Sequence, residues 1–331
     1  MQWQRMNHPD SNDLRTATSA RRGIYTLAND DVFDWLVALL SSIRHVEPDL
    51  PITVIPFDDR LRRVNRLRGR LHFDILPADR LRDLSGLGLE LWPDHDYPEK
   101  LFGKFASFWG PYDSFLFFDT DVIVLEPLTR FFEANEADRD HLYYFVEDRN
   151  EVYVPGPLRK SMVAERGSRG FNSGAFGGCR DLLTPEDLRQ AVLSARDVEG
   201  EFAHRGDQTF LNYAIDISDA TPVSYGDVIP GVAHSWAGRR FEPTPSGLVE
   251  KLAPGAAPTG TAPLLHWAGF DLSPKMPYFR LWLRERLRDC GPGATAGFLA
   301  SLLAAPLLTS RRLQRVRHAL RLRTRLRGPR A

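Results

Sequence analysis

The feature that most constrains the fold is a pair of aspartates enclosed by apolar residues, in the segment FLFFDTDVIVL at 115–125. Apolar runs this short are typical of buried strands, and an open parallel sheet gathers functional side chains at the carboxyl ends of its strands. Two carboxylates as close as those of Asp119 and Asp121 repel each other unless a positive charge lies between them. The pair therefore predicts a divalent-cation site, with Mn²⁺ or Mg²⁺ favoured because both accept oxygen ligands.

The sequence before the aspartates alternates between strand and helix patterns. Apolar runs predict strands at 23–28, 52–57 and 71–76. Apolar side chains three and four residues apart predict a helix at 33–43, and a basic segment predicts another at 58–69. This alternation is typical of an α/β fold with a mostly parallel central sheet flanked by helices.

The rest of the chain is predicted to continue this fold to about residue 290. Further strands are expected at 141–147, 171–178 and 264–269, and further helices at 99–109 and 205–215. Three polar or proline-rich stretches are expected to be irregular, namely 77–99, 148–170 and 242–263. We expect a disordered tail at 1–20, one domain at 21–290, and a second tail at 291–331.

The C-terminal tail has a composition of its own. An apolar stretch at 293–310 is followed by 311–331, which holds nine arginines and no acidic residue and leaves the rest of the chain acidic overall. We expect the tail to dock on an anionic membrane surface, the alternative being that it packs on the acidic body. Nucleic acid is not expected as a partner, because residues 311–331 contain no Phe, Tyr or Trp for base stacking. No apolar segment of signal-peptide length opens the chain, so we expect a cytoplasmic protein, peripheral on the inner face of the membrane.

Two classes of enzyme place the D-x-D pattern after an apolar strand. In haloacid-dehalogenase-type phosphatases the pattern lies near the start of the fold, whereas here a long α/β stretch at 21–114 precedes it. In nucleotide-sugar glycosyltransferases of the GT-A type, it follows a nucleotide-binding α/β half. There the metal neutralises the diphosphate leaving group. The order of the elements favours the second class.

From Gly23 to Lys275 the ordered motifs resemble those of glycosyltransferase family 8, the glycogenin and bacterial galactosyltransferase group. The resemblance implies the GT-A nucleotide-diphospho-sugar transferase fold. It also implies metal-dependent transfer of a sugar, expected from a UDP-sugar, with retention of the anomeric configuration. The acceptor is unknown, and the basic tail suggests a cell-envelope glycan or a glycolipid.

The resemblance assigns the nucleotide to two parts of the chain. In this family the end of the first strand holds the uracil and ribose, and the motif YTLANDD occupies that place. The nucleotide-binding candidates are therefore Tyr25, Ala28, Asn29 and Asp30. A basic residue before the D-x-D strand contacts the diphosphate in the family, and Lys104 stands nearest to that position, with Lys100 as the alternative.

Two further motifs match segments that face the donor sugar in the family. FNSGAFGG places Asn172 toward the sugar, with Ser173 and Gly174 beside it. GDQTFLN places Asp207 on a sugar hydroxyl and Gln208 near the reacting carbon. Asn172, Asp207 and Gln208 are thus the predicted catalytic residues, and Asn212 is expected to be structural.

The last motif supplies the third metal ligand. LHWAG resembles the family pattern H-x-x-G-x-x-K, in which the histidine binds the metal and the lysine contacts the diphosphate. His266 and Gly269 match this pattern. Lys275 stands farther from the glycine than the pattern requires, and it remains the candidate for the lysine.

Two other functions stay open at this point. A nucleotidyltransferase has a related nucleotide-binding half, although it would place a glycine-rich phosphate loop after the first strand, where YTLANDD has none. A catalytically silent nucleotide-sugar binder on a membrane surface would keep the metal site and show no transfer.

Overall fold

The structure is a computed structural model that describes residues 21–93, 98–251 and 260–300, apart from positions 289, 292 and 294. The tail predicted at 1–20 and the basic segment at 311–331 lie outside the described residues. Among the residues that are described, no helix is both long and apolar enough to cross a bilayer.

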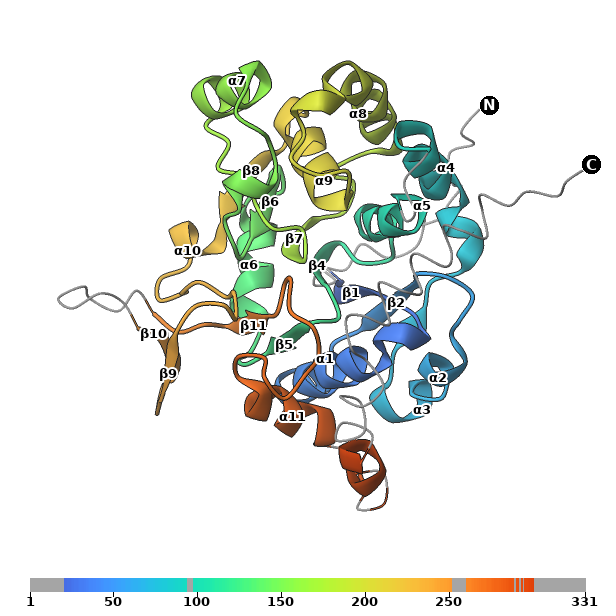
Figure 1. Ribbon diagram of the computed structural model, residues 1–331, viewed down its shortest axis with the longest axis vertical. Helices are drawn as coiled ribbons and strands as arrows, with labels where there is room; N and C mark the ends of the chain where they lie inside the picture. The colour runs from blue at the N-terminus through green and yellow to red at the C-terminus, as the bar shows by residue number, and fades with distance from the viewer. Residues whose placement is uncertain are drawn as a thin grey trace, which may run out of the picture.

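A seven-stranded sheet in the order β3–β2–β1–β4–β7–β6–β8 forms the centre of the molecule (Figure 1). Every neighbouring pair is parallel except the two that involve β7, which runs antiparallel to β4 and β6. The prediction of an α/β fold with a mostly parallel central sheet is therefore confirmed. The strands are β1 Arg22–Ala28, β2 Ile52–Pro56, β3 Asp74–Ile75, β4 Ser114–Phe118, β6 His141–Tyr144, β7 Ala175–Cys179 and β8 Thr221–Ser224.

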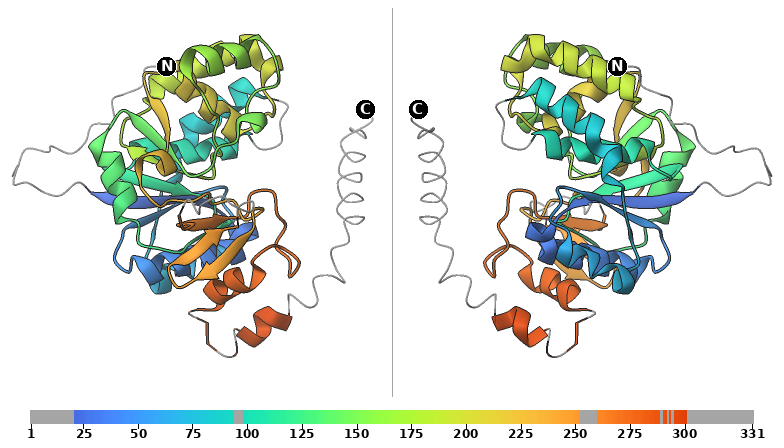
Figure 2. Two further views of the ribbon diagram at one scale, coloured as in Figure 1. Left: turned by 90° about the vertical axis from the view of Figure 1, so that its left-hand side faces the viewer. Right: turned by 90° about the vertical axis from the view of Figure 1, so that its right-hand side faces the viewer.

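Helices cover both faces of this sheet (Figures 1 and 2). One face packs against α4, α8 and α9 and the other against α1 and α6, which divides the core into two apolar clusters. The helices are α1 Phe33–Val46, α2 Arg62–Asn65, α3 Arg68–Leu71, α4 Arg82–Leu91, α5 Pro98–Leu101, α6 Thr129–Ala137, α7 Pro157–Arg166, α8 Pro185–Val198, α9 Asp207–Ile217, α10 Tyr225–Val228 and α11 Phe279–Leu287.

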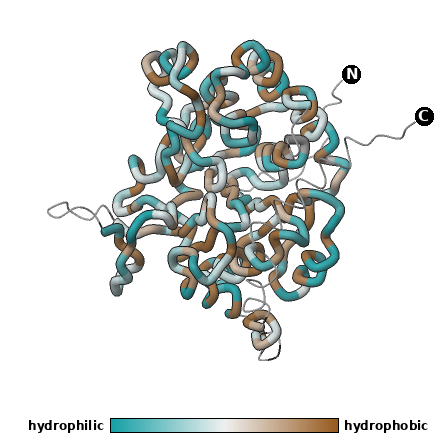
Figure 3. The backbone as a smooth tube through the Cα atoms, viewed as in Figure 1, coloured by the Kyte–Doolittle hydropathy of each residue, from teal (hydrophilic) through white to brown (hydrophobic). Residues whose placement is uncertain are grey.

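Strand β4 shows why its sequence is apolar at every position. Phe115 and Phe117 belong to the core cluster on one face, and Leu116 and Phe118 belong to the cluster on the other. Successive side chains of a strand point to opposite faces, so a strand with helices on both sides reads as a continuous apolar run. By contrast, the outer α2–α3 region is largely hydrophilic (Figure 3).

Several predicted elements differ in extent from the observed ones. Of the strand predicted at 71–76, only β3 at residues 74 and 75 is observed. The preceding residues differ because α3 extends to Leu71 and His72 takes a left-handed conformation with φ 45°. The predicted strand at 171–178 begins only at Ala175. The predicted helix at 99–109 is mostly a 3₁₀-helix, Phe102–Trp109, after the short α5.

The three stretches predicted to be irregular contain regular structure. Residues 77–99 include α4, whose Leu84, Leu87 and Leu91 form a buried stripe. Residues 148–170 include α7, which begins at a proline in its first turn. Residues 242–263 include most of an antiparallel hairpin, β9 Phe241–Thr244 and β10 Gly247–Glu250.

A small second sheet joins distant parts of the chain below the central one. After β4 the chain turns through the two aspartates and enters β5 Val122–Val124, which pairs antiparallel with β11 Leu264–His266. In this strand pair His266 lies opposite Val122, and Val122 directly follows Asp121 in the sequence. This pairing brings the end of the domain to the carboxyl end of β4.

Candidate metal centre

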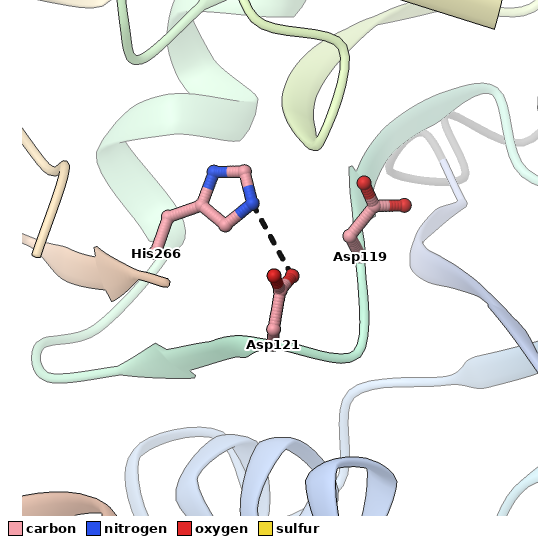
Figure 4. A group of neighbouring side chains, drawn as sticks. All are labelled: Asp119, Asp121 and His266. Atoms are coloured by element: carbon pink, nitrogen blue, oxygen red, sulfur yellow. Dashed lines mark ion pairs between the residues drawn. The ribbon is translucent and has the colours of Figure 1, made fainter. Parts of the chain in front are cut away.

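The three predicted metal ligands lie together (Figure 4). Asp119, Asp121 and His266 each offer one ligand atom, and these atoms all lie within 4.8 Å of one another. The Nε2 atom of His266 is 3.2 Å from Oδ1 of Asp121. The backbone fixes the arrangement, because the N–H of Asp119 donates to Gly174 O at 2.7 Å and the N–H of Trp267 donates to Asp121 O at 2.9 Å.

Gly174 keeps the space between these ligands open. A Cβ atom at this position would stand 2.7 Å from Oδ2 of Asp119 and 2.7 Å from Nε2 of His266. Two carboxylates and one imidazole around such a space suit a divalent cation. The two carboxylates suit Mg²⁺ or Mn²⁺, and the imidazole is a common ligand of transition-metal ions. The residues present therefore fit the group that the sequence predicts.

The two carboxylates have different electrostatic environments. Burial raises the pKa of Asp119 to about 6, the nearby Asp121 carboxylate adds to the rise, and the Lys104 ammonium opposes it. For Asp121, burial acts in the same upward direction, but His266 outweighs it and lowers the pKa. A cation between the two groups would favour the ionised form of both.

The Lys104 side chain is buried next to the candidate metal site and is enclosed by protein atoms. Its side chain is 2% exposed, and its Nζ atom is 3.5 Å from Oδ1 of Asp119 and in an ion pair with Asp207. Nζ also donates to the backbone oxygen and Oγ of Ser173, both at 3.3 Å. Burial lowers the pKa of Lys104, yet the two carboxylates raise it overall, so the ammonium stays charged. The predicted direct contact with a diphosphate does not fit this enclosed position, and Lys104 instead holds Asp119 and Asp207 in place.

The predicted sugar-binding residues adjoin the candidate metal ligands. Ser173 links them, because its Oγ donates to Oδ2 of Asp207 at 2.7 Å and its N–H donates to Oε1 of Gln208 at 3.3 Å. Oδ1 of Asn172 accepts from the N–H of Gly174 at 2.9 Å. Asn212 exchanges two hydrogen bonds of 2.8 Å with the backbone of Phe171, so it tethers α9 to this segment.

The residues at the end of β1 play mainly structural parts. Tyr25 is fully buried between Tyr112 and Phe115, so its ring offers no surface to a base, and this prediction is corrected. Ala28 is also fully buried. The Asp30 carboxylate accepts from the N–H groups of residues 63 and 64 at the start of α2.

Asn29 is linked to a cavity through its hydrogen bond with Asp58. Its Oδ1 accepts from the N–H of Asp31, and its Nδ2 donates to Oδ2 of Asp58 at 3.0 Å. Asp58 lines a pocket of about 690 Å³ together with Phe57 and Lys100. Lys100, the alternative to Lys104, is therefore the lysine that reaches open space.

The last two predicted residues stay at the surface. Gly269 is exposed and has φ +81°, a conformation that favours glycine, so it shapes the turn after β11. Lys275 is exposed, and its N–H donates to Oγ of Ser273 within a turn. The structure does not bring either residue into the group of metal ligands.

One acidic residue of the site was not predicted. Oδ2 of Asp148 accepts from Nε2 of Gln208 at 3.1 Å, and burial raises the pKa of Asp148. Asp148 follows the apolar run HLYYFVE, so it repeats the pattern of Asp119: a carboxylate after a buried strand. The rule that identified Asp119 could have identified Asp148 as well.

No protein-family model matches the sequence, and no curated protein matches it by sequence. Among solved structures, the bifunctional glycosyltransferase WbbM aligns with 86% of this chain and 52% of its own, at 13% identity and a TM-score of 0.49. The chain thus spans about half the length of that structure. The galactosyltransferase LgtC, in complex with donor and acceptor sugar analogues, aligns with 83% of this chain and 99% of its own, at 17% identity and a TM-score of 0.49. The glycosyltransferase GlyE of Streptococcus pneumoniae aligns with 86% of this chain and 64% of its own, at 16% identity and a TM-score of 0.45.

Proposed function

We propose that this protein is a metal-dependent glycosyltransferase of the GT-A type that uses a nucleotide sugar, expected to be a UDP-sugar. One observation carries the proposal: Asp119, Asp121 and His266 meet around a space that Gly174 keeps open, at the carboxyl end of a central strand. A bound cation would supply positive charge to the diphosphate leaving group. The sequence motifs around these residues support the same assignment.

The nucleoside is assigned to the pocket of about 690 Å³ at the ends of β2 and β3. Asn29 and Asp58 form one part of its surroundings through their shared hydrogen bond. Lys100 lies over the ring of Phe57 at 5.9 Å and lines the same pocket. We assign to Lys100 the contact with phosphate oxygens that the family resemblance implied for Lys104, because the ammonium of Lys100 lines the pocket and can meet an anion there.

The donor sugar is assigned to Asn172, Asp207 and Gln208. Ser173 and Lys104 hold Asp207, so its carboxylate is fixed in direction before a sugar binds. Preorganised acceptors of this kind position a hydroxyl group at little entropic cost. Gln208 is a poor nucleophile, and we propose that configuration is retained by departure and attack on one face of the sugar. Proton NMR of the first product reads its anomeric configuration.

The test measures UDP affinity by titration calorimetry with Mn²⁺, with Mg²⁺ and with EDTA. We expect tight binding only with metal, and Asp121→Ala should abolish it while the melting temperature stays near that of the wild type. Equal UDP affinity with and without metal contradicts the proposal.

A second measurement separates the remaining alternatives. Slow hydrolysis of one nucleotide sugar in a panel, with release of the free sugar, is expected of a glycosyltransferase that lacks its acceptor. Release of pyrophosphate from a nucleoside triphosphate would indicate a nucleotidyltransferase instead. Metal-dependent binding without any turnover would indicate a silent binder.

A further inference from the structure

A pocket of about 540 Å³ opens beside the metal site and takes no part in holding the metal. One of its walls contains Asp148, which accepts a hydrogen bond from Gln208. Another wall is formed by residues 232–234 and Arg239. The same segment pairs with β11, where the N–H of His266 donates to Ser235 O at 2.9 Å. A molecule in this pocket would lie next to the sugar assigned to Gln208.

The pocket carries more positive than negative charge. Arg149 and Arg159 both line it, and neither has an ion pair with a carboxylate of the described residues. Arg239 pairs with Glu250 at 2.7 Å, and Glu147 shares Arg169 with Asp227, at 2.8 Å and 2.7 Å. The lining holds three arginines, at 149, 159 and 239, and two acidic residues, Glu147 and Asp148, so it suits an anionic ligand. Arg159 also donates to Oδ1 of Asn150 at 2.9 Å.

His234 adds a hydrogen-bond donor to the same pocket. Its Nδ1 accepts from the N–H of Trp236 at 3.1 Å. Burial and, next, the Arg239 guanidinium lower the pKa of His234 to about 4, so the imidazole is neutral at physiological pH. With Nδ1 accepting, the single ring proton lies on Nε2. His234 lines the pocket, so this proton is a candidate donor to a ligand oxygen.

Trp236 follows His234 of this pocket by two residues, and it is the one aromatic side chain among the exposed large apolar residues of the described chain, at 38% exposure. Its Nε1–H donates to Ala268 O at 3.2 Å, and its ring lies against Gly238, where a Cβ atom would come within 2.5 Å of it. Phe270 contacts it with the ring centroids 6.3 Å apart. A ring that is fixed and still exposed can stack on the C–H face of a sugar, because its π face is negative.

We propose that this pocket and Trp236 form the acceptor site, and that the acceptor is an anionic saccharide, a sugar that carries a phosphate or a carboxylate group. The proposal rests on the proposed function. Arg149 and Arg159 bind the anionic group, Trp236 stacks on a sugar ring, and Asp148 orients the attacking hydroxyl.

The transfer reaction needs only the acceptor hydroxyl and the nucleotide sugar. The acceptor oxygen forms a bond to the anomeric carbon as the bond from that carbon to the diphosphate oxygen breaks. The nucleoside diphosphate leaves with the electron pair of the broken bond and takes up the hydroxyl proton. No oxidant or other co-reactant is needed.

The experiment titrates the full chain, loaded with Mn²⁺ and UDP, with four probes: glucose 6-phosphate, glucuronic acid, methyl glucoside and inorganic phosphate. We expect a charged sugar to bind more tightly than methyl glucoside. The double variant Arg149→Gln and Arg159→Gln should weaken charged sugars by about tenfold. Arg70→Gln, which removes an exposed arginine outside the pocket, is the matched control and should change nothing.

A separate pair of variants tests the aromatic platform. Trp236→Ala should weaken every sugar probe, and Trp236→Phe should restore most of the affinity because a ring remains. Inorganic phosphate should be insensitive to both changes.

The results of these titrations decide whether the pocket is an acceptor site and which anionic group it binds. Tighter binding of glucose 6-phosphate or of glucuronic acid shows which anionic group the pocket prefers. Charged sugars that bind no more tightly than methyl glucoside overturn the proposal, as does inorganic phosphate that binds as tightly as the sugar phosphate. If UDP itself fails to bind with Mn²⁺, the proposed function fails; if UDP binds and the double variant has no effect, only the acceptor assignment fails.

Discussion

The lack of a side chain at Gly174 leaves the centre of the candidate metal site open. Replacing it by alanine would set a methyl group among the ligand atoms of Asp119 and His266. We predict that Gly174→Ala lowers Mn²⁺-dependent UDP affinity by at least about tenfold, because the methyl group occupies the space of the ion. Titration calorimetry measures the loss.

The control for this variant is Gly200→Ala. A Cβ atom at Gly200 meets nothing within 4 Å, and the substitution should leave UDP affinity unchanged. Wild-type affinity in Gly174→Ala would show that the ion does not sit between these ligands.

Asp30 illustrates a residue whose role is local stability. Its carboxylate accepts from two backbone N–H groups at the start of α2. Burial opposes ionisation, but these hydrogen bonds outweigh it and lower the pKa of Asp30. We predict that Asp30→Ala lowers the free energy of unfolding by about 0.5–2 kcal/mol at pH 7, as loss of a helix cap does.

The sign of the pH dependence follows from the lowered pKa. The stabilisation is present above the pKa of an unfolded aspartate and is lost as the pH falls through the lower folded value. Urea unfolding at pH 7 and at pH 3 should therefore show a smaller difference between wild type and variant in acid. A difference that grows in acid would contradict this assignment.

Asp119, Asp121 and His266, which do lie together, could be identified from the sequence because their signal is local. Asp119 and Asp121 stand out against apolar neighbours on both sides, and His266 closes an apolar run. Tyr25 was assigned to the wrong environment, because a strand that is buried on both faces gives no sign of which face a residue occupies. The burial of Lys104 could not be predicted from the sequence either, because it depends on contacts with both Asp119 and Asp207, which are far apart in the chain.

At the level of elements, α4 shows how a helix escaped prediction. Its two glycines and flanking prolines resemble a loop in sequence, whereas its leucines pack into the core against the 3₁₀-helix and α8. Tertiary burial outweighed local propensity there. The hairpin β9–β10 was missed for the related reason that its strands are only four residues long and largely exposed.

The same helix offers a stabilising substitution. Gly86 is exposed in the middle of α4, and a Cβ atom there would meet nothing within 4 Å. We predict that Gly86→Ala raises the free energy of unfolding by about 0.5–1 kcal/mol, because alanine loses less backbone entropy in a helix. Thermal or urea unfolding checks the change, and an unchanged or lower midpoint would contradict it. UDP affinity should remain that of the wild type.

For the whole molecule, the alternation of strands and helices was enough to predict the fold class. Strand order was not available from the pattern, because the insertion of the antiparallel β7 between β4 and β6 depends on contacts between distant segments. The boundaries at 20 and 290 and the cytoplasmic location remain predictions.

The basic tail leads to a prediction that concerns the intact chain. We propose that residues 293–331 dock on an anionic membrane, with the apolar stretch at the headgroup boundary and arginines attracted by the surface. The full chain should sediment with phosphatidylserine-containing vesicles at low salt and less at high salt. Replacement of the arginines of 311–327 by glutamine should leave the protein in the supernatant. Equal sedimentation of the two proteins would remove the case for a membrane-linked acceptor.

The pairing of β5 with β11 has a consequence for the timing of activity. Two of the three candidate metal ligands, Asp119 and Asp121, are synthesised well before the third, His266. A ribosome-bound chain that ends before β11 can form the first strands of the sheet but holds just the two aspartates. On the proposed function, the cation would bind tightly only after β11 has left the ribosome, so that catalysis would start only once His266 has joined the two aspartates.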